Sequence, residues 1–378
     1  MNLYLKHTLF YLLGISYALI SSAQSNPDKL QCKVTGRMLL DGGVYLKNDN
    51  NFGNGVEFND LRIGAKVAYQ NWDMKLEIGY TGNKATIKDA FAKYTYKNHS
   101  IQVGQFYEPF SLEMMCSTFD IRFNQSPGAV LALTNGRGIT YSYRNKRYYM
   151  SGGAFMDNEV NNLKKASHGY ALDGRVVYRP VLDSKKLIHI GFAVNYRTPN
   201  ESLNEEDKNI FIYKSPGVST IDNRNIAMAT IDHAAYQIKF GTELLVYYHR
   251  FCLQSEYIRT HVERDNAFKN YVAQGAYLQC SWLLSGETYL YDESVACAGR
   301  PEGKSLEVCS RFNYLTLNDE DAAIWGGEQK DISIGLNYYI NKYIGIKLNY
   351  SYLMPGASIK EISRKNFSVF QGRFQFIF

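Results

Sequence analysis

Lysine and arginine side chains recur with period two in segments whose alternate residues are apolar. The basic residues on these polar faces are Lys33, Arg37, Arg62, Lys66, Lys75, Arg175, Arg179 and Arg197. Carboxylates share the faces, namely Asp41, Glu77, Asp89 and Asp173. Ammonium and guanidinium groups bind oxyanions through charge-assisted hydrogen bonds, and a guanidinium can form two parallel ones. These faces either attract anions or are simply polar surfaces in contact with water. The pattern leaves both interpretations open.

Catalytic chemistry has weaker support in this sequence. Beyond residue 23, histidines are scattered at positions 99, 168, 189, 233, 249 and 261, and neither G-x-S-x-G nor H-E-x-x-H occurs. His189 and His249 fall within alternating segments, which favours structural roles. The sequence therefore predicts neither an enzyme nor a bound metal or cofactor.

Cysteine spacing leaves several interpretations open. Six cysteines, at positions 32, 116, 252, 280, 297 and 309, show no C-x-x-C spacing, which argues against zinc and thioredoxin-like sites. A disulfide between Cys297 and Cys309 would close a Gly/Pro segment. Cys252 and Cys280 are equidistant from Asn266, as in a symmetric hairpin. Buried free thiols are the preferred alternative.

The first 23 residues have the order of a secretory signal peptide. A short start, with Lys6 as its only lysine or arginine, precedes the apolar stretch 8–20. Ser21-Ser22-Ala23 then provides the small residues that a signal peptidase recognises. We expect cleavage after Ala23 and an exported domain of residues 24–378. The alternative is a short N-terminal helix of a cytosolic protein.

Composition narrows the class of protein. The 378 residues include 42 Lys+Arg and 36 Asp+Glu, a net charge of +6, and 14% are aromatic. The aromatic content excludes a disordered chain, and the small charge excess gives no reason to expect a nucleic-acid partner. No run of 18 apolar residues occurs, which excludes a transmembrane helix but leaves short spanning strands.

Alternation of apolar and polar residues continues through the chain and predicts antiparallel β-strands. It is seen in 33–46, 61–69 and 74–81, and again in GITYSYR, IHIGFAVNYR, DISIGLNYYI and YIGIKLNYSY. In the final segment, Phe370, Phe374, Phe376 and Phe378 alternate with Gln371, Arg373 and Gln375. A last strand that ends in Phe is the signal read by the outer-membrane barrel assembly machinery. With aromatic residues near strand ends, it favours a membrane barrel over a soluble sandwich.

Chain length predicts the number of strands. A spanning strand with its connection takes about 22 residues, so roughly 355 residues predict about 16 strands. The expected fold is an all-β, transmembrane antiparallel β-barrel, and a barrel of this size encloses an aqueous channel.

Several motifs point to a family. The most specific are VGQFYEPFSLE at 103–113 and LLSGE-x-x-x-Y at 283–291, and further ones are GRMLLDGGVY at 36–45, GRVVYRP at 174–180 and LEVCSRFNYLTLND at 306–319. These stretches resemble the phosphate-selective porin O and P family of Gram-negative outer membranes. The resemblance runs through nearly the whole exported chain. It implies a 16-stranded, usually trimeric barrel that passes small solutes by diffusion, with a third outer loop folded inward to narrow the pore.

By position, the segment that follows Glu113 should be this inward loop. Within it and at its end, Arg122 and Arg137 are the candidates for the pore constriction, because arginines replace the lost hydration of an anion. Arg122 resembles a basic position of the family's loop.

The expected function is a porin of the outer membrane for small hydrophilic solutes, with or without a preference for anions such as inorganic phosphate. The expected partners are these solutes, outer-membrane lipids, the barrel assembly machinery and two further copies of the chain. The alternative is a non-conducting structural or surface-receptor barrel with a plugged lumen. For that alternative the polar segment 201–225 is the candidate surface loop, although a plain solvated connection is its preferred interpretation.

Overall fold

The computed structural model describes residues 29–378 apart from 48, 82–83, 134, 157–165, 203–208, 223, 266 and 357–362. The expected signal peptide, residues 1–23, lies outside the described residues. In the described part of the chain, no helix is long and apolar enough to span a bilayer.

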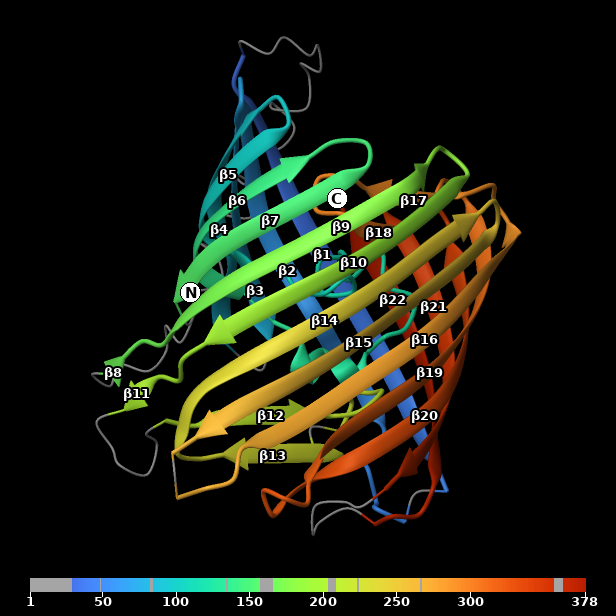
Figure 1. Ribbon diagram of the computed structural model, residues 1–378. Helices are drawn as coiled ribbons and strands as arrows, with labels where there is room; N and C mark the ends of the chain where they lie inside the picture. The colour runs from blue at the N-terminus through green and yellow to red at the C-terminus, as the bar shows by residue number, and fades with distance from the viewer. Residues whose placement is uncertain are drawn as a thin grey trace, which may run out of the picture.

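Sixteen of the described strands form a closed antiparallel barrel (Figure 1). In order around the barrel they are β1 (Gln31–Leu46), β2 (Gly55–Tyr69), β3 (Trp72–Thr81), β4 (Lys84–Tyr96), β5 (His99–Tyr107), β6 (Asn135–Arg144), β7 (Tyr148–Met156), β9 (Tyr170–Leu182), β10 (Lys186–Arg197), β14 (Ala234–Tyr248), β15 (Phe251–Arg264), β16 (Tyr271–Ser285), β19 (Ser305–Asp319), β20 (Ile324–Tyr339), β21 (Ile344–Pro355) and β22 (Phe367–Ile377). The barrel closes between β1 and β22, where Arg37 lies opposite Ile377 and Leu46 opposite Ser368. Closure removes the unpaired sheet edges that lipid does not tolerate. The predicted antiparallel barrel and its strand number are confirmed.

The other described elements lie in connections between barrel strands. They are the 3-10 helix η1 (Pro127–Leu131) and three two-stranded sheets, β8 (Ala166–Ser167) with β11 (Glu201–Ser202), β12 (Phe211–Ser215) with β13 (Ala227–Ile231), and β17 (Tyr289–Asp292) with β18 (Cys297–Pro301). Tyr213 of β12 is 3% exposed and belongs to an apolar cluster with Leu131 of η1. The interpretation of segment 201–225 as a plain solvated connection is therefore wrong for this packed part.

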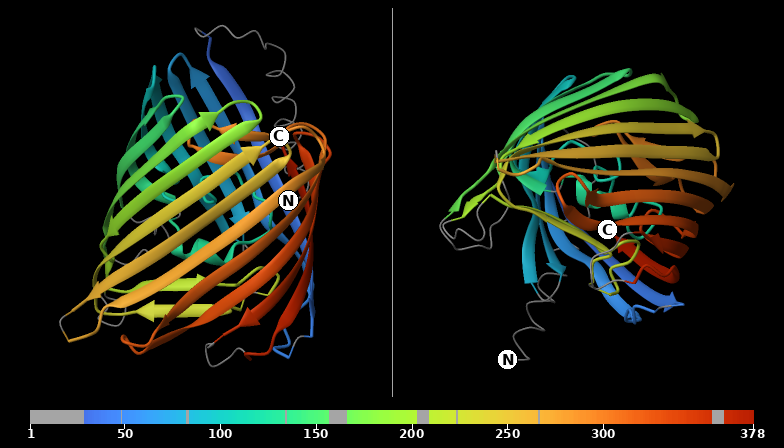
Figure 2. Two further views of the ribbon diagram at one scale, coloured as in Figure 1. Left: turned by 45° about the vertical axis from the view of Figure 1, so that its right-hand side comes forward. Right: turned by 60° about the horizontal axis from the view of Figure 1, so that its bottom comes forward.

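The two ends of the barrel differ in their connections. At one end, called the turn end, strands join through the short turns 70–71, 97–98, 145–147, 183–185, 249–250 and 340–343. The opposite end, called the loop end, carries the long connections 108–134 and 198–233. In both views of Figure 2, the teal trace of segment 108–134 runs within the ring of strands. The turn end has one long connection, residues 286–304, which carries the β17–β18 hairpin labelled in the upper part of Figure 1.

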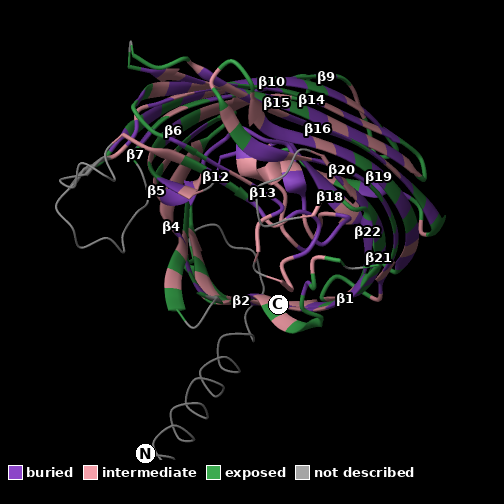
Figure 3. Cartoon of the chain, turned by 90° about the horizontal axis from the view of Figure 1, so that it is seen from below, coloured by how far each residue is buried: buried purple, intermediate pink, exposed green. Residues whose placement is uncertain are grey.

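Most barrel strands have a mainly apolar outer face and a mainly polar inner face. In β22 and at the residue that follows it, the aromatic side chains of one face are exposed or half-buried, namely Phe370, Phe374, Phe376 and Phe378. The polar side chains of the other face are buried, namely Gln371, Arg373 and Gln375. The same alternation of exposed and buried residues gives the strands their striped colouring in Figure 3. Apolar residues outside and polar residues inside suit a barrel surrounded by lipid and filled by polar groups.

Aromatic side chains lie near both ends of the outer face. At the turn end, the rings of Trp72 and Tyr94 are 5.0 Å apart between centroids. At the loop end, Tyr196 lies 6.0 Å from Tyr170 and 5.4 Å from Tyr236. Indole and phenol rings prefer the boundary between hydrocarbon and water, so these positions fit the predicted girdles.

Candidate pore constriction and passage

The motif 103–113 ends β5 and starts the long connection 108–134, here called the β5–β6 loop. Gly104 has a φ of +131°, and a Cβ atom there would lie 2.2 Å from a main-chain oxygen of β4. This conformation requires glycine. Beyond β5 the motif supplies two carboxylates, Glu108 and Glu113, that are 2% and 8% exposed. The motif thus fixes where the chain leaves the barrel wall.

Both carboxylates pair with arginines of distant strands. Glu113 accepts hydrogen bonds of 2.5 and 3.0 Å from Arg311 of β19, and Glu108 lies 2.5 Å from Arg197 of β10. Burial alone would raise the pKa of Glu113, but the Arg311 guanidinium holds this pKa below its usual value. Paired hydrogen bonds between charged groups are directional, so these two pairs fix the position of the loop.

Polar side chains of the inner face bind the backbone of the β5–β6 loop. Lys239, Lys347 and Arg373 donate to carbonyl oxygens of the loop at 2.9, 3.2 and 3.1 Å. Asn337 and Gln375 do the same at 3.1 and 3.2 Å. These donors come from β14, β20, β21 and β22. They satisfy irregular backbone that would otherwise lack partners, and the loop in turn occupies this side of the lumen.

A second segment, residues 286–304, enters the barrel from the turn end. Arg175 of β9 donates to two main-chain carbonyls of the β17–β18 hairpin, both at 2.7 Å, and pairs with Glu243 of β14 at 2.9 Å. The Tyr291 hydroxyl lies 2.9 Å from Nδ1 of the buried His189. The hairpin is therefore bound to the inner faces of β9, β10 and β14.

The β5–β6 loop and the β17–β18 hairpin meet inside the barrel. Arg122 of the loop donates to the Gly299 carbonyl at 3.1 Å, and Arg300 of the hairpin pairs with Asp120 of the loop at 3.2 Å. Burial raises the pKa of Asp120, while the nearby Arg300 charge opposes the shift. Arg122 also pairs with Glu307 of β19 at 3.4 Å. Segments from opposite ends of the barrel thus form one polar contact.

The position of Arg122 differs from its predicted place at an open constriction. Arg122 is 2% exposed, and its guanidinium lies 5.1 Å from the centroid of the Tyr289 ring. The Glu307 carboxylate balances its charge, and the Gly299 carbonyl accepts one of its donors. Arg122 therefore joins the loop to the hairpin instead of facing open space.

Arg137 also differs from its predicted place. β6 begins at Asn135, so Arg137 is a strand residue, and it shares a face with the exposed Ile139 and Tyr141. Its Nε lies 3.4 Å from the side-chain oxygen of Gln105 on the neighbouring strand. Because side chains alternate between the two faces of a strand, Arg137 lies on the outer face of the barrel and does not line the constriction.

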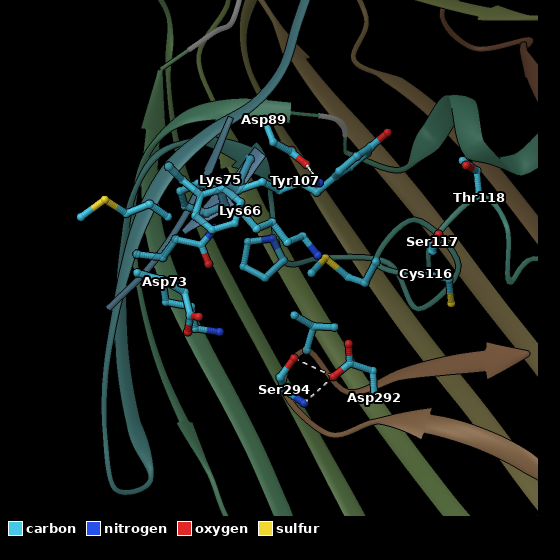
Figure 4. Close-up of a pocket in the computed structure, with 18 of the residues that line it drawn as sticks. Lys66, Asp73, Lys75, Asp89, Tyr107, Cys116, Ser117, Thr118, Asp292 and Ser294 are labelled. Atoms are coloured by element: carbon cyan, nitrogen blue, oxygen red, sulfur yellow. Dashed lines mark hydrogen bonds and ion pairs between the residues drawn. The ribbon is translucent and has the colours of Figure 1, made fainter. Parts of the chain in front are cut away.

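The two inward segments leave a cavity of about 1220 Å³ along β1–β5. Its lining runs from residues beside the turn 70–71 to the end of β5. Figure 4 shows Lys66 and Lys75 on the barrel wall, residues 116–118 on the facing loop, and Asp292 from the hairpin. The lining contains seven basic residues, Lys29, Lys33, Arg37, Arg62, Lys66, Lys75 and Lys93, against four acidic ones, Asp73, Asp89, Glu113 and Asp292.

Three of these lysines form a row across neighbouring strands, here called the lysine row. Lys33 of β1 lies opposite Lys66 of β2, which lies opposite Lys75 of β3. Lys75 is paired with Asp89 at 2.5 Å, but no carboxylate of the described residues pairs with Lys33 or Lys66. Like charges directly opposite each other repel, so an anion beside the row would lower the energy.

Two arginines lie where the wall approaches the loop. Arg37 and Arg62 face each other across β1 and β2, and the Arg37 guanidinium hydrogen-bonds the Thr118 hydroxyl of the loop. Arg62 pairs with Asp60 at 2.6 Å and with Glu77 at 2.9 Å, and Arg37 pairs with the same Asp60 at 3.3 Å. Arg37 therefore bridges the wall and the loop at the edge of the cavity.

The eight basic residues predicted for the lumen divide into two groups. The five on β1–β3 line the cavity, namely Lys33, Arg37, Arg62, Lys66 and Lys75. The other three, Arg175, Arg179 and Arg197, also lie on inner faces but are 0%, 1% and 9% exposed. They are bound to carboxylates and main-chain carbonyls, so they hold inward segments and turns in place.

Sequence reasoning missed two parts of the site. Lys93 lines the cavity from β4 on the same face as Phe91, and the alternation in that strand would have identified it. The inward course of the β17–β18 hairpin had no comparable signal, because the motif 283–291 indicated only a turn at the end of a strand. Gly286, with a φ of +101°, does form that turn.

Comparisons with known proteins agree with this architecture. Residues 32–378 match the family profile described as "Phosphate-selective porin O and P". Porin O of Pseudomonas aeruginosa is 22% identical over 379 residues, covering 84% of this chain and 82% of that protein, and an uncharacterized protein of Caulobacter vibrioides is 25% identical over 350 residues, covering 85% and 68%. The anion-selective porin from Comamonas acidovorans shares the fold, with a TM-score of 0.61 at 10% identity, over 93% of this chain and 100% of that one. The profile match across nearly the whole described chain shows that this protein belongs to the phosphate-selective porin O and P family.

Proposed function

We propose that the protein is a passive channel that lets small hydrophilic solutes cross the outer membrane and prefers anions, inorganic phosphate among them. The cavity along β1–β5 carries this proposal, because its lining holds seven basic and four acidic residues. The family description and the name of the Comamonas porin support the preference for anions.

The preference would arise from charge on one wall only. Four basic residues of β9–β22 are bound to the hairpin or the β5–β6 loop, namely Arg175, Lys239, Lys347 and Arg373. Lys33 and Lys66 are instead exposed to the cavity. An anion that loses part of its hydration there would gain charge-assisted hydrogen bonds from ammonium groups. No covalent step and no cofactor is part of this transport.

The proposed route to the membrane begins with export. Residues 1–23 would direct export and be removed after Ala23, leaving residues 24–378 as the barrel domain. The alternating aromatic strand β22 would be recognised by the barrel assembly machinery, and the apolar outer face would contact outer-membrane lipids. Short turns mark the periplasmic end of such barrels, so the loop end would face outward. We also propose a homotrimer, as is usual in the family.

Recording from single channels in a planar bilayer tests the proposal. We expect open steps in groups of three, a reversal potential on the anion side in a KCl gradient, and block of the current by added phosphate. Steps without ion preference would leave a general porin. Correctly folded, heat-modifiable protein without conductance would favour the non-conducting surface-receptor barrel with a plugged lumen.

Replacing Arg37 should weaken the anion preference. Arg37→Gln removes one positive charge at the edge of the cavity, together with the guanidinium that bonds Thr118. A unit charge roughly 7 Å from an ion in water contributes about 0.6 kcal/mol, with opposite sign for anions and cations. At low salt the permeability of anions should therefore fall about threefold and that of cations should rise about threefold, which lowers the ratio of the two. Arg137→Gln, which removes a charge from the outer face, is the control and should leave the ratio unchanged. An equal effect of both changes would contradict the assigned passage.

A further inference from the structure

Two cysteines from segments that enter the barrel at opposite ends lie together inside it. Cys116 belongs to the β5–β6 loop, and Cys297 is the first residue of β18 in the hairpin. Cys297 belongs to a buried apolar cluster against which Cys116 packs, and the Cys116 thiol donates to the Leu112 carbonyl at 3.1 Å. We infer that Cys116 and Cys297 form a disulfide in the exported protein and thereby tie the loop covalently to the hairpin.

The backbone on each side of this pair is already held by polar contacts. Arg175 binds the two carbonyls immediately before Cys297, both at 2.7 Å. Beyond it, Gly299 accepts a hydrogen bond from Arg122, and Arg300 pairs with Asp120. These contacts hold the loop and the hairpin against each other independently of the cysteines, and a disulfide needs such close backbones, with Cα atoms about 4.4–6.8 Å apart.

An apolar cluster surrounds the two sulfurs. Cys297 is 4% exposed and belongs to a buried cluster with Leu187, Leu245 and Leu283, against which Cys116 packs. Burial disfavours a charged thiolate at Cys297. The half-buried Cys116 also lines the cavity along β1–β5, so it is the thiol that an oxidant can reach.

The pairings suggested by the sequence have a different geometry. Cys252 lies opposite Ser281 and Cys280 opposite Leu253, and Cys252 is buried on the inner face while Cys280 lies on the alternate, outer face. These two cannot form a disulfide across the hairpin that joins β15 and β16. The Cys309 sulfur is instead 3.6 Å from the amide nitrogen of Asn337.

The chemistry of the bond requires an external oxidant. The oxidant is a protein disulfide in the export compartment. The Cys116 thiolate attacks one sulfur of that disulfide and forms a mixed disulfide, which releases the other sulfur as a thiolate. The Cys297 thiolate then displaces the oxidant from Cys116. The S–S bond of the oxidant breaks and one S–S bond forms in the barrel, while two electrons and, through water, the two thiol protons pass to the oxidant, which becomes a dithiol.

The number of reactive thiols in the exported protein tests this inference. The full chain is purified from outer membranes and denatured in the presence of N-ethylmaleimide, which blocks every free thiol. Disulfides are then reduced, and the thiols they release are labelled with a maleimide-polyethylene glycol that shifts mobility on a gel. Of the six cysteines, four should be blocked in the first step and two labelled in the second. Mass spectrometry of unreduced peptides should find the peptide that contains Cys116 linked to the peptide that contains Cys297.

Single serine variants identify the partners. Cys116→Ser and Cys297→Ser should each abolish the label that follows reduction, because the remaining partner is blocked in the first step. Cys280→Ser, which changes a cysteine of the outer face, is the matched control and should keep both labels. Heat-modifiable migration confirms that each barrel is folded. Wild-type protein with six blocked thiols, or label that persists in Cys116→Ser, would overturn the inference. None of these outcomes depends on conductance.

Discussion

Replacing Lys33 and Lys66 together by glutamate is expected to convert the channel from anion-preferring to cation-preferring. The two residues face each other in the lysine row, are exposed to the cavity, and form no ion pair with a carboxylate of the described residues. The double change alters the wall charge by four units. At about 0.6 kcal/mol per charge roughly 7 Å from the ion, the sum is about 2.4 kcal/mol for each ion, so at low salt the anion permeability should fall about 50-fold and the cation permeability should rise by the same factor.

Screening sets the size of the effect that a bilayer experiment will show. At 0.1 M salt the Debye length is about 10 Å, so the expected change falls to roughly tenfold, which still reverses the sign of the reversal potential. The neutral pair Lys33→Gln and Lys66→Gln should give about half this change in free energy. Lys342→Glu, at an exposed turn away from the cavity, is the control and should leave the sign unaltered.

An unchanged reversal potential in the double glutamate variant would contradict the passage along β1–β3. Lys75 is left in place because it is paired with Asp89 and Glu77, and a glutamate at 75 would meet two carboxylates. The comparison therefore tests the unpaired charge of the lysine row and not the integrity of the wall.

The barrel could be predicted from the sequence because its signal is local. A period of two places Phe374 outside and Arg373 inside whatever the rest of the chain does. The number of strands follows from length, because each crossing of the membrane takes a nearly fixed number of residues. Such rules do not state what the inner face contacts.

The site could be predicted only in part because its contacts are remote. Glu113 and Arg311 are 198 residues apart, and alternation shows only that Arg311 points inward. Whether an inward arginine meets water or another segment depends on where the β5–β6 loop and the hairpin lie. For that reason Arg175 and Lys33 have the same pattern in sequence, yet one is fully buried and the other is exposed to the cavity.

The error at Arg137 has a simpler cause. Arg137 was expected at the end of the inward loop, although β6 already begins at Asn135. Gly136 and Gly138 lie close to Phe155 of the neighbouring strand, where a Cβ atom would come within 2.9 and 2.7 Å of its ring. These glycines therefore serve strand packing. Glycine alone did not distinguish a loop from a tightly packed strand.

Breaking the pair between Glu113 and Arg311 is expected to release the β5–β6 loop and raise the conductance. In Glu113→Gln, Arg311 keeps its charge at 2% exposure without a counter-ion. Removing one partner of a buried pair costs about 3–5 kcal/mol, more than the exposed pairs of this barrel contribute. Larger and noisier open steps, and faster trypsin cleavage within the loop, should follow.

Acid should have the same effect on the unmodified protein. The pKa of Glu113 is lowered from its ordinary 4.5, because Arg311 outweighs burial. The stabilisation by this carboxylate is thus complete above pH 4.5 and is lost as the pH falls through the lowered folded-state pKa. The conductance of the wild type should rise below that pH, whereas Glu113→Gln should lack this contribution of residue 113 to the pH dependence.

An exposed ion pair with a similar N–O distance is the control that separates the effect of burial from the effect of bond geometry. Lys365 and Asp49 are 2.6 Å apart, but their side chains are 76% and 46% exposed. Exposed pairs contribute about 0–1 kcal/mol, so Asp49→Asn should leave the conductance and the cleavage rate unchanged. The double variant Glu113→Gln with Arg311→Gln should lose less stability than the sum of the losses in the two single variants, because it leaves no unpaired buried charge. Additive losses would mean that the two residues hold the loop independently, and the pair would not be its anchor.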